Sequence, residues 1–326
     1  MKISANIWLF CRHRLSWLIY PLVVGVLLYQ CAPALLQAGS KNGFDVTDSL
    51  LPAGDIHHGG PARDGIPAID QPRFIAASQV SFLADKDRVL GIDRHGLSKA
   101  YPIKILNYHE IVNDSFEREA IVVSYCPLCG TGMAFTASVD GSVRNFGVSG
   151  LLYNNDVLLY DRQTESLWSQ LMKQAISGPM RGKRLQQIVM LHTTWGDWRA
   201  QHPNSLVLST HTGYQRDYQR SPYAGYAGSA ELYFPITKMD PRYHPKEMVI
   251  GVSVAGANKA YPFAELARGS GDLRDSLAGQ HLRIRYDAEN RSGRVFDTSG
   301  EELPSTLSYW FAWQAFHPHT EVYRAP

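Results

Sequence analysis

The distribution of hydrophobic residues divides the chain into an apolar N-terminal segment and a strand-rich body. Residues 15–36 form a run of 22 uncharged, mostly apolar residues. A bilayer is spanned by about 20 such residues, so the run is long enough to cross one. Lys2, Arg12 and Arg14 precede it. We therefore expect residues 1–38 to be a signal peptide or a transmembrane anchor, with the body outside the cytoplasm, in the periplasm or cell envelope, because the positive flank comes first.

Two features of this segment leave its processing open. Leu36-Gln37-Ala38 before Gly39 only half meets the small-residue pattern of a cleavage site. Cys31 follows the bulky Gln30, which disfavours a lipid-modified cysteine. A cleaved signal and a retained anchor both fit, and an uncleaved segment would make the membrane a partner of the protein.

The body shows the apolar periodicity of short strands. The run 120–125 (AIVVSY) is continuously apolar, which predicts a central strand buried on both faces. The Asp-Gly pair at 140–141 lies between two apolar stretches and predicts a hairpin. Residues 195–202 predict a short helix that ends before Pro203. Further strands are expected at 89–93, 100–105, 133–139, 143–148 and 157–160.

Two pairs of segments recur in the same order. Residues 89–102 (VLGIDRHGLSKAYP) and 249–262 (VIGVSVAGANKAYP) match at seven of fourteen positions. Residues 195–203 (WGDWRAQHP) and 310–318 (WFAWQAFHP) share two tryptophans, an alanine and the His-Pro pair. Repeats of supersecondary size usually stack to share a core.

These repeats lead to a prediction for the whole body. We expect a strand-rich α+β fold made of two tandem copies of one module packed together, at about 85–209 and 245–324, with a long insert in the first copy. Both copies would belong to a single domain, residues 64–326, preceded by a partly ordered lead-in segment at 39–63.

Composition and charge exclude two classes of protein. Lys and Arg number 32 against 30 Asp and Glu, and no basic stripe stands out, so nucleic acid is not an expected partner. Four cysteines are too few for a disulfide-dense scaffold. Because Cys11 and Cys31 belong to the N-terminal segment, the body has only Cys126 and Cys129. Neither a small-molecule nor a protein partner can be named from the sequence, and the oligomeric state stays open.

The Cys126-x-x-Cys129 motif is the sharpest chemical feature of the chain. It follows the buried strand, so one tight loop would present both sulfurs. In the second copy, Asp287 and Asn290 stand at these positions, so the thiol pair is specific to the first copy. Two thiolates at this spacing can bind a metal ion, cycle between dithiol and disulfide, or form a fixed disulfide that braces the loop.

We favour a metal ion and expect His109 and Met133 as further ligands. Thiolate and thioether donors select Cu(I), which is our first choice, with zinc second. His109 also has two other interpretations, a base beside the ligands or a histidine bonded to backbone. An extracytoplasmic thiol–disulfide oxidoreductase and a non-catalytic binding module with a structural disulfide remain alternatives.

Residues 149–190 have no counterpart in the second copy. They carry Asp161 and Glu165, the candidates for acid–base catalysis, although charged loop residues are usually just solvated. Inserts on repeated scaffolds often map to a binding face. We expect this insert to cover the Cys-x-x-Cys loop, with Asp161 or Trp168 lining a cleft. Whether the protein is an enzyme is not decided by these residues.

Four segments resemble the bacterial domain-of-unknown-function 3179 family. They are 64–70 (DGIPAID), 99–114 (KAYPIKILNYHEIVND), 124–135 (SYCPLCGTGMAF) and 154–170 (NNDVLLYDRQTESLWSQ). The resemblance runs from about Asp64 to the His-Pro pair at 317–318. It implies one continuous domain with His109, the two cysteines and the insert as hallmark residues, but no substrate or reaction.

Overall fold

The structure, a computed structural model, describes residues 39–326. The expected signal peptide or anchor at 1–38, with Cys31, lies outside the described residues. Within residues 39–326, no helix combines the length and apolar character needed to cross a bilayer.

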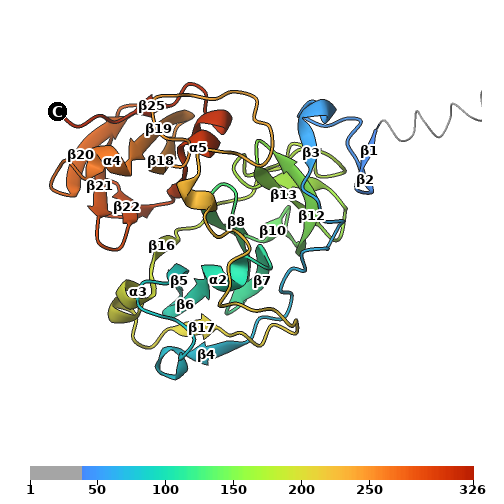
Figure 1. Ribbon diagram of the computed structural model, residues 1–326, viewed down its shortest axis with the longest axis horizontal. Coiled ribbons are helices and arrows are strands. Elements are labelled where there is room, and N and C mark those ends of the chain that lie inside the picture. Colours follow the sequence, from blue (N-terminus) through green and yellow to red (C-terminus); the bar gives the residue numbers. More distant parts are fainter. Residues whose placement is uncertain (1–38) are drawn as a thin grey trace, which may run out of the picture.

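Five β-sheets form the blades of a strand-rich, five-bladed β-propeller (Figure 1). The prediction of an α+β fold made of two copies of one module is therefore wrong. The α-helices of the described residues are one or two turns long and form no layer of their own: α2 (Ile103–Leu106), α3 (Trp195–Gln201), α4 (Phe263–Leu266) and α5 (Trp310–Phe316).

Each blade is named here after one of its strands. The β5 blade has the order β16 (Leu191–Thr194), β5 (Arg88–Arg94), β6 (Leu97–Pro102), β17 (Leu206–Leu208), β4 (Phe74–Ala76). The β8 blade has the order β7 (Ile111–Phe116), β8 (Glu119–Cys126), β9 (Thr131–Thr136). The β12 blade has the order β15 (Gln174–Ala175), β14 (Leu167–Ser169), β13 (Asp156–Asp161), β12 (Phe146–Tyr153), β3 (Ile56–His58).

The C-terminal part of the chain supplies the other two blades. The β18 blade has the order β24 (Thr306–Tyr309), β18 (Met248–Val254), β19 (Ala257–Pro262), β25 (Glu321–Val322). The β21 blade has the order β20 (Asp272–Leu277), β21 (Gln280–Asp287), β22 (Ser292–Phe296), β23 (Glu302–Leu303). Two small hairpins complete the sheets: β1 (Ser40–Lys41) with β2 (Phe44–Asp45), and β10 (Ser138–Val139) with β11 (Ser142–Val143). Single 3-10 turns lie at Ala53–Asp55, Ala77–Gln79 and Tyr226–Gly228.

The recurring sequence motifs correspond to a local likeness between blades. The β5–β6 hairpin pairs from Val89↔Pro102 to Arg94↔Leu97, and the β18–β19 hairpin pairs in the same register from Val249↔Pro262 to Val254↔Ala257. A matched motif shows that two hairpins are alike, but it does not show which sheet each strand joins. Residues 149–190, expected as an insert on a finished module, instead provide most of a separate blade, which β3 from the lead-in segment completes.

The matched tryptophans pack on the matched glycines. A Cβ atom on Gly91 would lie 2.2 Å from the Trp198 ring, and one on Gly251 would lie 2.2 Å from the Trp313 ring. The indole N–H of Trp198 donates to Ser205 Oγ at 2.9 Å, which fixes the ring in place. Each short helix is therefore held flat on its blade by a contact that only glycine permits.

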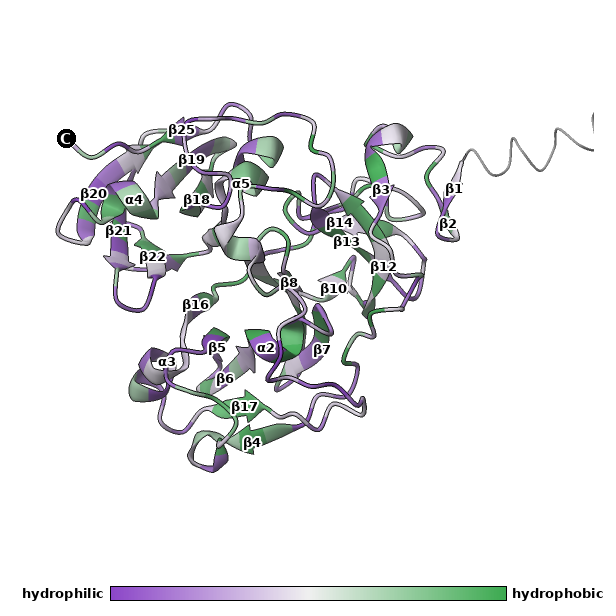
Figure 2. Ribbon diagram, viewed as in Figure 1, coloured by the Kyte–Doolittle hydropathy of each residue, from purple (hydrophilic) through white to green (hydrophobic). Residues whose placement is uncertain are grey.

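The β8 blade has neighbours on several sides. β24 lies against β9, β12 lies against β7, and α2 lies against β8. One face of this blade contributes to the largest described core cluster, which also includes residues from the β12 blade and from α5. Figure 2 shows hydrophobic residues concentrated in strands such as β4 and β17, whereas β20 and β21 are mostly hydrophilic. The end of β8, where the cysteines lie, is thus deep in the molecule.

The glycine–tryptophan contacts yield a stability prediction. We expect Gly91→Ala and Gly251→Ala each to lower the free energy of unfolding by about 1–3 kcal/mol, because the methyl group has to displace an indole ring in a close-packed core. Gly54→Ala is the control, since a Cβ atom there meets no atom within 4 Å. Chemical denaturation measures all three variants. Equal stability of Gly91→Ala and Gly54→Ala would contradict the packing described.

Candidate metal centre

The Cys-x-x-Cys motif forms the tight loop between β8 and β9. Cys126, the last residue of β8, pairs with Thr131, the first residue of β9. Gly130 closes the loop in the left-handed region, at φ 61°, where other residues are strained. A side chain at Gly130 would also collide with the Tyr309 ring, 2.8 Å from the ideal Cβ position. The glycine is needed for both reasons, and the loop brings the two sulfurs together.

The turn between β12 and β13 faces this loop. Asn154 and Asn155 adopt φ 51° and 62°, and asparagine tolerates this conformation in two-residue hairpin turns. The turn points the carbonyl oxygen of Asn155 at the cysteines. Both Cys126 and Cys129 donate their S–H groups to this oxygen, each at 3.3 Å.

Asp156, directly after that turn, completes a group of three potential ligands. A carboxylate oxygen of Asp156 and the two sulfurs all lie within 4.8 Å of one another. Donor atoms in a tetrahedral zinc site are about 3.5–3.8 Å apart, given Zn–S of about 2.3 Å and Zn–O of about 2.0–2.2 Å. Small side-chain movements would therefore bring the three donors onto one ion. Within the described residues, this is the group of His, Cys, Asp and Glu side chains with that geometry.

The two carboxylate oxygens of Asp156 have different surroundings. Oδ2 accepts hydrogen bonds from Leu171 N at 3.0 Å and Ser169 Oγ at 3.4 Å. Oδ1 is buried and has no hydrogen-bond partner among the described residues. A buried carboxylate oxygen without a partner is costly unless it binds a cation or a proton. Asp156 Oδ1 is thus the oxygen expected to bind a metal.

The site holds more acidic groups than it can charge without a cation. Burial raises the pKa of Asp156 to about 8. Burial also raises the pKa of the Cys129 thiol well above its usual value, with further increases from the hydrogen bond to Cys126 and the nearby charge of Asp156. Both cysteines are free and almost fully buried. A metal ion would release these protons and compensate the charges that burial disfavours.

Glu110 lies near this group in a strained conformation. Its φ is 57°, its side chain is buried, and its carboxylate has no hydrogen-bond partner among residues 39–326. Burial, with a smaller contribution from the charge of Asp156, raises its pKa to about 8. Glu110 O accepts from Tyr125 N just as Gly271 O accepts from Tyr286 N in the β21 blade, both at 2.7 Å.

The comparison with Gly271 shows that glycine suits this backbone position. Gly271 has φ 78°, which glycine adopts without penalty. A non-glycine residue in this region costs about 1–3 kcal/mol, and such residues cluster at functional sites. The strain at Glu110 is therefore a sign that its carboxyl group serves a function.

Four tyrosine side chains lie near the sulfurs. Tyr223, Tyr226 and Tyr309 pack in the same core cluster as both cysteines, whereas Tyr125 packs in another cluster, against His192. The negative charge of the cysteines contributes to the raised pKa of each ring hydroxyl, after burial, and Tyr309 reaches about 12. None of the four hydroxyls has a hydrogen-bond partner among the described residues, and that of Tyr226 is fully buried. The rings are those of Tyr125, Tyr223, Tyr226 and Tyr309. They exclude water from the thiols and offer hydroxyl groups to any ligand that reaches the site.

The segment 210–247, which links the β5 and β18 blades, covers the site (Figure 1). Asn155 Nδ2 donates to Phe234 O at 2.7 Å, and Phe234 N donates back to Asn155 Oδ1 at 3.0 Å. Thr237 N donates to Asn154 Oδ1 at 2.7 Å. The turn that holds the thiols on one side thus holds the covering segment on the other.

The structure places His109 away from the sulfurs. Its Nδ1 lies 2.8 Å from Pro67 O, and its Nε2 lies 2.7 Å from the Tyr218 hydroxyl. With both ring nitrogens engaged, His109 is not available as a ligand, and of our three interpretations the backbone-bonded one describes its geometry. Met133 lies in the same core cluster as both cysteines, and its role as a ligand stays a prediction.

The acid–base candidates of residues 149–190 have structural partners instead. Asp161 accepts from Thr164 N at 2.8 Å and from the Trp168 indole N–H at 2.9 Å, which shapes the β13–β14 turn. Glu165 is exposed and pairs with Arg63 at 2.8 Å. Trp168 is fully buried in the core. The β12–β13 turn of residues 149–190 does pack on the thiol loop, through the Asn155 carbonyl oxygen, but Asp161, Glu165 and Trp168 take no part in that contact.

Sequence reasoning missed Asp156, Glu110 and the tyrosines as site residues. A sequence signal existed for two of them. Asp156 follows the Asn154-Asn155 pair, which the second repeat lacks, and Glu110 adjoins His109 in a motif that the second repeat also lacks. The tyrosines on the segment 210–247 carry no periodic or spacing signal, because they reach the site through a long loop.

Comparison with known proteins identifies the family. The profile described as "Protein of unknown function (DUF3179)" matches residues 63–320. The chain belongs to this family. No curated protein and no solved structure matches it. The match covers all three ligand candidates and Glu110, so the site lies within the region that defines the DUF3179 family.

The strain at Glu110 can be tested by mutation. We expect Glu110→Gly to raise the free energy of unfolding by about 1–3 kcal/mol, because it relieves the backbone and removes a buried carboxyl group. Glu117→Gly is the matched control, since Glu117 has φ 51° but is exposed in a hairpin turn. Glu117→Gly should raise the free energy of unfolding only by the amount that comes from relieving the backbone. A destabilised Glu110→Gly protein would argue that the carboxyl group supports the fold.

The raised pKa of Asp156 predicts how stability depends on pH. The unfolded carboxyl ionises near pH 4 and the folded one near pH 8, so between these values the folded protein binds more protons. The contribution of this proton to the free energy of unfolding is full below pH 4. It is lost as the pH rises to 8, at up to about 1.4 kcal/mol per pH unit. We expect Asp156→Asn to flatten the pH profile of unfolding measured with a chelator present. Parallel profiles would contradict the buried carboxyl.

Proposed function

We propose that this protein binds one zinc ion through Cys126, Cys129 and Asp156, with the fourth position open to water or substrate. The observation that carries the proposal is the buried, unpartnered oxygen of Asp156 beside two free thiols. Catalytic zinc sites typically have three protein ligands and one open position, whereas structural sites are closed by four. The proposed centre is therefore of the catalytic type.

The donor set favours zinc over copper. Zinc accepts thiolate and carboxylate ligands together, whereas Cu(I) selects soft thiolate and thioether donors. Our first choice of Cu(I) from the sequence assumed ligands other than a carboxylate, and the position of Asp156 reverses the order of preference. Zinc bound by two thiolates and one carboxylate leaves a net charge of minus one, far less than the three negative charges of the empty, deprotonated site.

Cu(I) remains the second candidate for one specific reason. Because the pKa of Asp156 is raised to about 8, its carboxyl group is mostly protonated at neutral pH in the absence of a metal. A site that presents only two sulfurs suits Cu(I), and Met133 lies in the same core cluster as both cysteines. Zinc binding would have to displace the Asp156 proton, whereas Cu(I) binding would not.

The two alternatives without metal have less support. A redox-active cysteine needs a lowered pKa, so that its thiolate can attack. Burial raises the pKa of Cys129 instead, and both sulfurs donate to one carbonyl oxygen. Neither thiol is bridged, as a structural disulfide would require.

Glu110 is proposed as the proton acceptor of this centre. Its carboxyl group is buried near Asp156, and its pKa of about 8 suits proton exchange near neutral pH. A water molecule bound to zinc loses its proton more readily than free water, which generates a nucleophile. The proposed activity is accordingly a zinc-assisted addition of water to a small substrate that fits among the tyrosine hydroxyls.

The location outside the cytoplasm is part of the proposal and rests on the sequence of residues 1–38. An oxidising compartment threatens free thiols. The covering segment 210–247 and the surrounding tyrosines limit access to both sulfurs, and restricted access slows thiol oxidation. A bound metal ion would protect them further.

Metal analysis of the full-length protein, purified anaerobically, tests the proposal. We expect one zinc ion per chain, which Cys126→Ser and Cys129→Ser abolish. Asp156→Asn should weaken zinc binding at least tenfold, about 1.4 kcal/mol, in a chelator competition, because it removes the anionic oxygen ligand. His109→Gln is the matched control and should keep full occupancy, since both of its ring nitrogens bind other groups.

The same variants separate the two metals. Asp156→Asn should leave the affinity of a Cu(I) site built on sulfur alone almost unchanged. The same variant should lower the affinity of a zinc site at least tenfold. Wild-type protein that binds neither zinc nor Cu(I) with its thiols reduced would overturn the metal proposal.

A further inference from the structure

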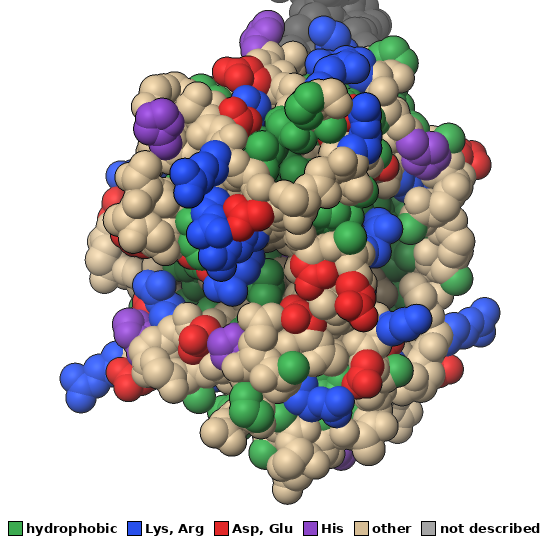
Figure 3. Space-filling model, turned by 90° about the vertical axis from the view of Figure 1, so that its left-hand side faces the viewer, with side chains coloured by type: hydrophobic (Ala, Val, Ile, Leu, Met, Phe, Trp, Pro, Cys, Tyr) green, Lys and Arg blue, Asp and Glu red, His purple; other side chains and the backbone are tan. Residues whose placement is uncertain are grey.

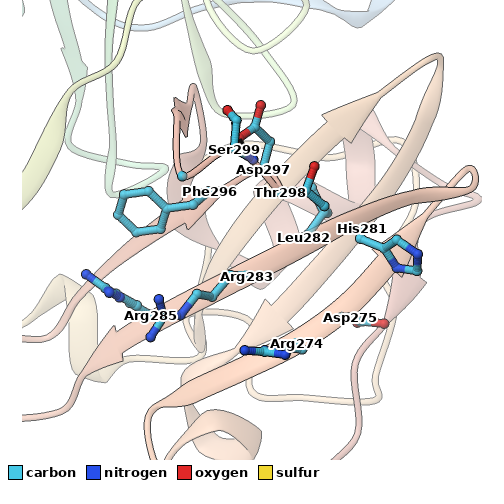
Figure 4. A pocket seen from close by; sticks show the side chains of 11 residues that line it. Arg274, Asp275, His281, Leu282, Arg283, Arg285, Phe296, Asp297, Thr298 and Ser299 are labelled. Atoms are coloured by element: carbon cyan, nitrogen blue, oxygen red, sulfur yellow. Dashed lines mark hydrogen bonds between the residues drawn. The ribbon is translucent and has the colours of Figure 1, made fainter.

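The β21 blade has an open hollow on one face, far along the chain from the thiols. The hollow measures about 590 Å³ and lies between β20, β21 and the loop after β22. In Figure 4, Arg274, Arg283 and Arg285 lie along one side of it, and Thr298 and Ser299 lie along the other. Figure 3, which looks onto this side of the molecule, shows a cluster of Lys and Arg side chains with Asp and Glu side chains beside it, and further charged side chains of both signs over the rest of the face.

Two of these arginines have no acidic partner among the described residues. Arg283 pairs with Asp272, Nε to Oδ1 at 2.8 Å. Arg274 is Arg283's cross-strand neighbour and makes no ion pair or hydrogen bond within residues 39–326. Arg285 likewise has none, and its guanidinium lies 5.1 Å from the centre of the Phe296 ring. The hollow therefore contains two guanidinium groups that are free to bind an anion.

The acidic groups around the hollow are already engaged. Asp275 pairs with Lys259 at 2.8 Å. Asp297 Oδ1 accepts from Ser299 N at 2.8 Å and from Glu301 N at 3.0 Å, inside its own loop. Its charge is thus directed into the loop backbone. Asp272 compensates part of the positive charge, since it pairs with Arg283 and lies cross-strand from Arg285, but neither Arg274 nor Arg285 has an ion-pair partner of its own among residues 39–326.

The β8 blade shows what the corresponding face of a sheet does when another blade packs on it. The β7–β8 and β20–β21 hairpins have the same six-pair register, which places Asn113, Val122 and Ser124 at the positions of the three arginines. The β12 blade packs on these residues: Asn113 exchanges hydrogen bonds with the Phe146 backbone at 2.8 Å, and Gln170 donates to Ser124 at 2.8 Å.

The corresponding face of the β21 blade has arginines and a hollow in place of such contacts. A face freed from packing needs only to be polar, and mixed charges would keep it soluble. Three arginines stand together on this face, and Asp272, the cross-strand neighbour of Arg285 and the ion-pair partner of Arg283, is the acidic residue among them. One acid against three arginines leaves an excess of positive charge, which suits an anion.

We propose that this hollow is a binding site for a phosphate group, held by Arg274 and Arg285. The planar guanidinium fork matches two phosphate oxygens at once, and Arg is the usual residue for such recognition. The hydroxyl group of Thr298, on the opposite side, adds a hydrogen-bond donor, whereas that of Ser299 already donates to Asp297 Oδ1 at 2.6 Å. The site is independent of the proposed metal centre, because no residue is shared between them.

Isothermal titration of the full-length protein with inorganic phosphate tests the proposal. We expect saturable binding that weakens as salt is added, because the contacts are charged. Arg274→Ala combined with Arg285→Ala should lower the affinity at least tenfold, and replacement of both by Lys should give an intermediate loss. The matched control is Arg118→Ala, an exposed arginine in the β7–β8 turn, which should bind phosphate like the wild type.

Vesicles distinguish a free phosphate from a lipid headgroup. Full-length protein is added to phosphatidylcholine vesicles with and without phosphatidylglycerol, so that any insertion of residues 1–38 is common to both. If the wild type binds the phosphatidylglycerol vesicles more strongly and the double alanine variant does not, the ligand is a lipid headgroup. If the wild type binds inorganic phosphate but shows no extra vesicle binding, the ligand is a soluble phosphate. Absence of both, or binding that the double variant retains while its unfolding temperature matches the wild type, would overturn the proposal.

Discussion

The carbonyl oxygen of Asn155 is the point on which the site depends. It accepts both thiol protons, while the side chain of the same residue holds the covering segment at Phe234. One turn therefore joins the β8 blade, the β12 blade and the segment 210–247. This geometry needs two consecutive residues that tolerate left-handed φ values, and the Asn-Asn pair provides them. Without that turn, neither Asp156 nor the cover would reach the cysteines.

The second constraint is electrostatic. Asp156, Glu110 and Cys129 are buried, and in each case burial is the largest cause of the raised pKa. A fold that needed only packing would place apolar side chains here, because buried acids without partners reduce stability. The group resembles the empty form of a cation site, in which protons occupy the donors until a metal displaces them. A metal bound there, as proposed, would recover the stability that the buried acids cost.

The sequence reveals local features more reliably than their assembly. The β5–β6 hairpin, the helix at Trp195–Gln201 and the Cys-x-x-Cys loop could be predicted because their signals lie within ten or so residues. The hairpin expected around Asp140-Gly141 joins only the short strands β10 and β11, whereas β9 and β12 belong to different blades. The propeller could not, because the same apolar alternation fits any sheet, and β3 joins β12 across about ninety residues of chain. The site followed the same division: both cysteines were found, Asp156 was seen only as part of a polar stretch, and Tyr226 was not found at all.

The comparison of blades explains why the proposed metal site and the arginine hollow occur at different places on similar hairpins. In the β8 blade, the strand end is roofed by the β12 turn, which allows thiols to stay dry and reduced. In the β21 blade, Asp287 and Asn290 replace the cysteines and bond to each other, at 2.8 Å from Asn290 Nδ2 to Asp287 Oδ2. Asn290 Oδ1 also accepts from Thr194 Oγ1 at 2.5 Å, so that loop is held by the β5 blade, and Gly271 replaces the strained Glu110. The unroofed sheet face beside it is then available for charged side chains. Burial thus separates the two proposed sites: the thiols lie where the β12 turn and the segment 210–247 cover them, whereas Arg274 and Arg285 lie on an exposed sheet face.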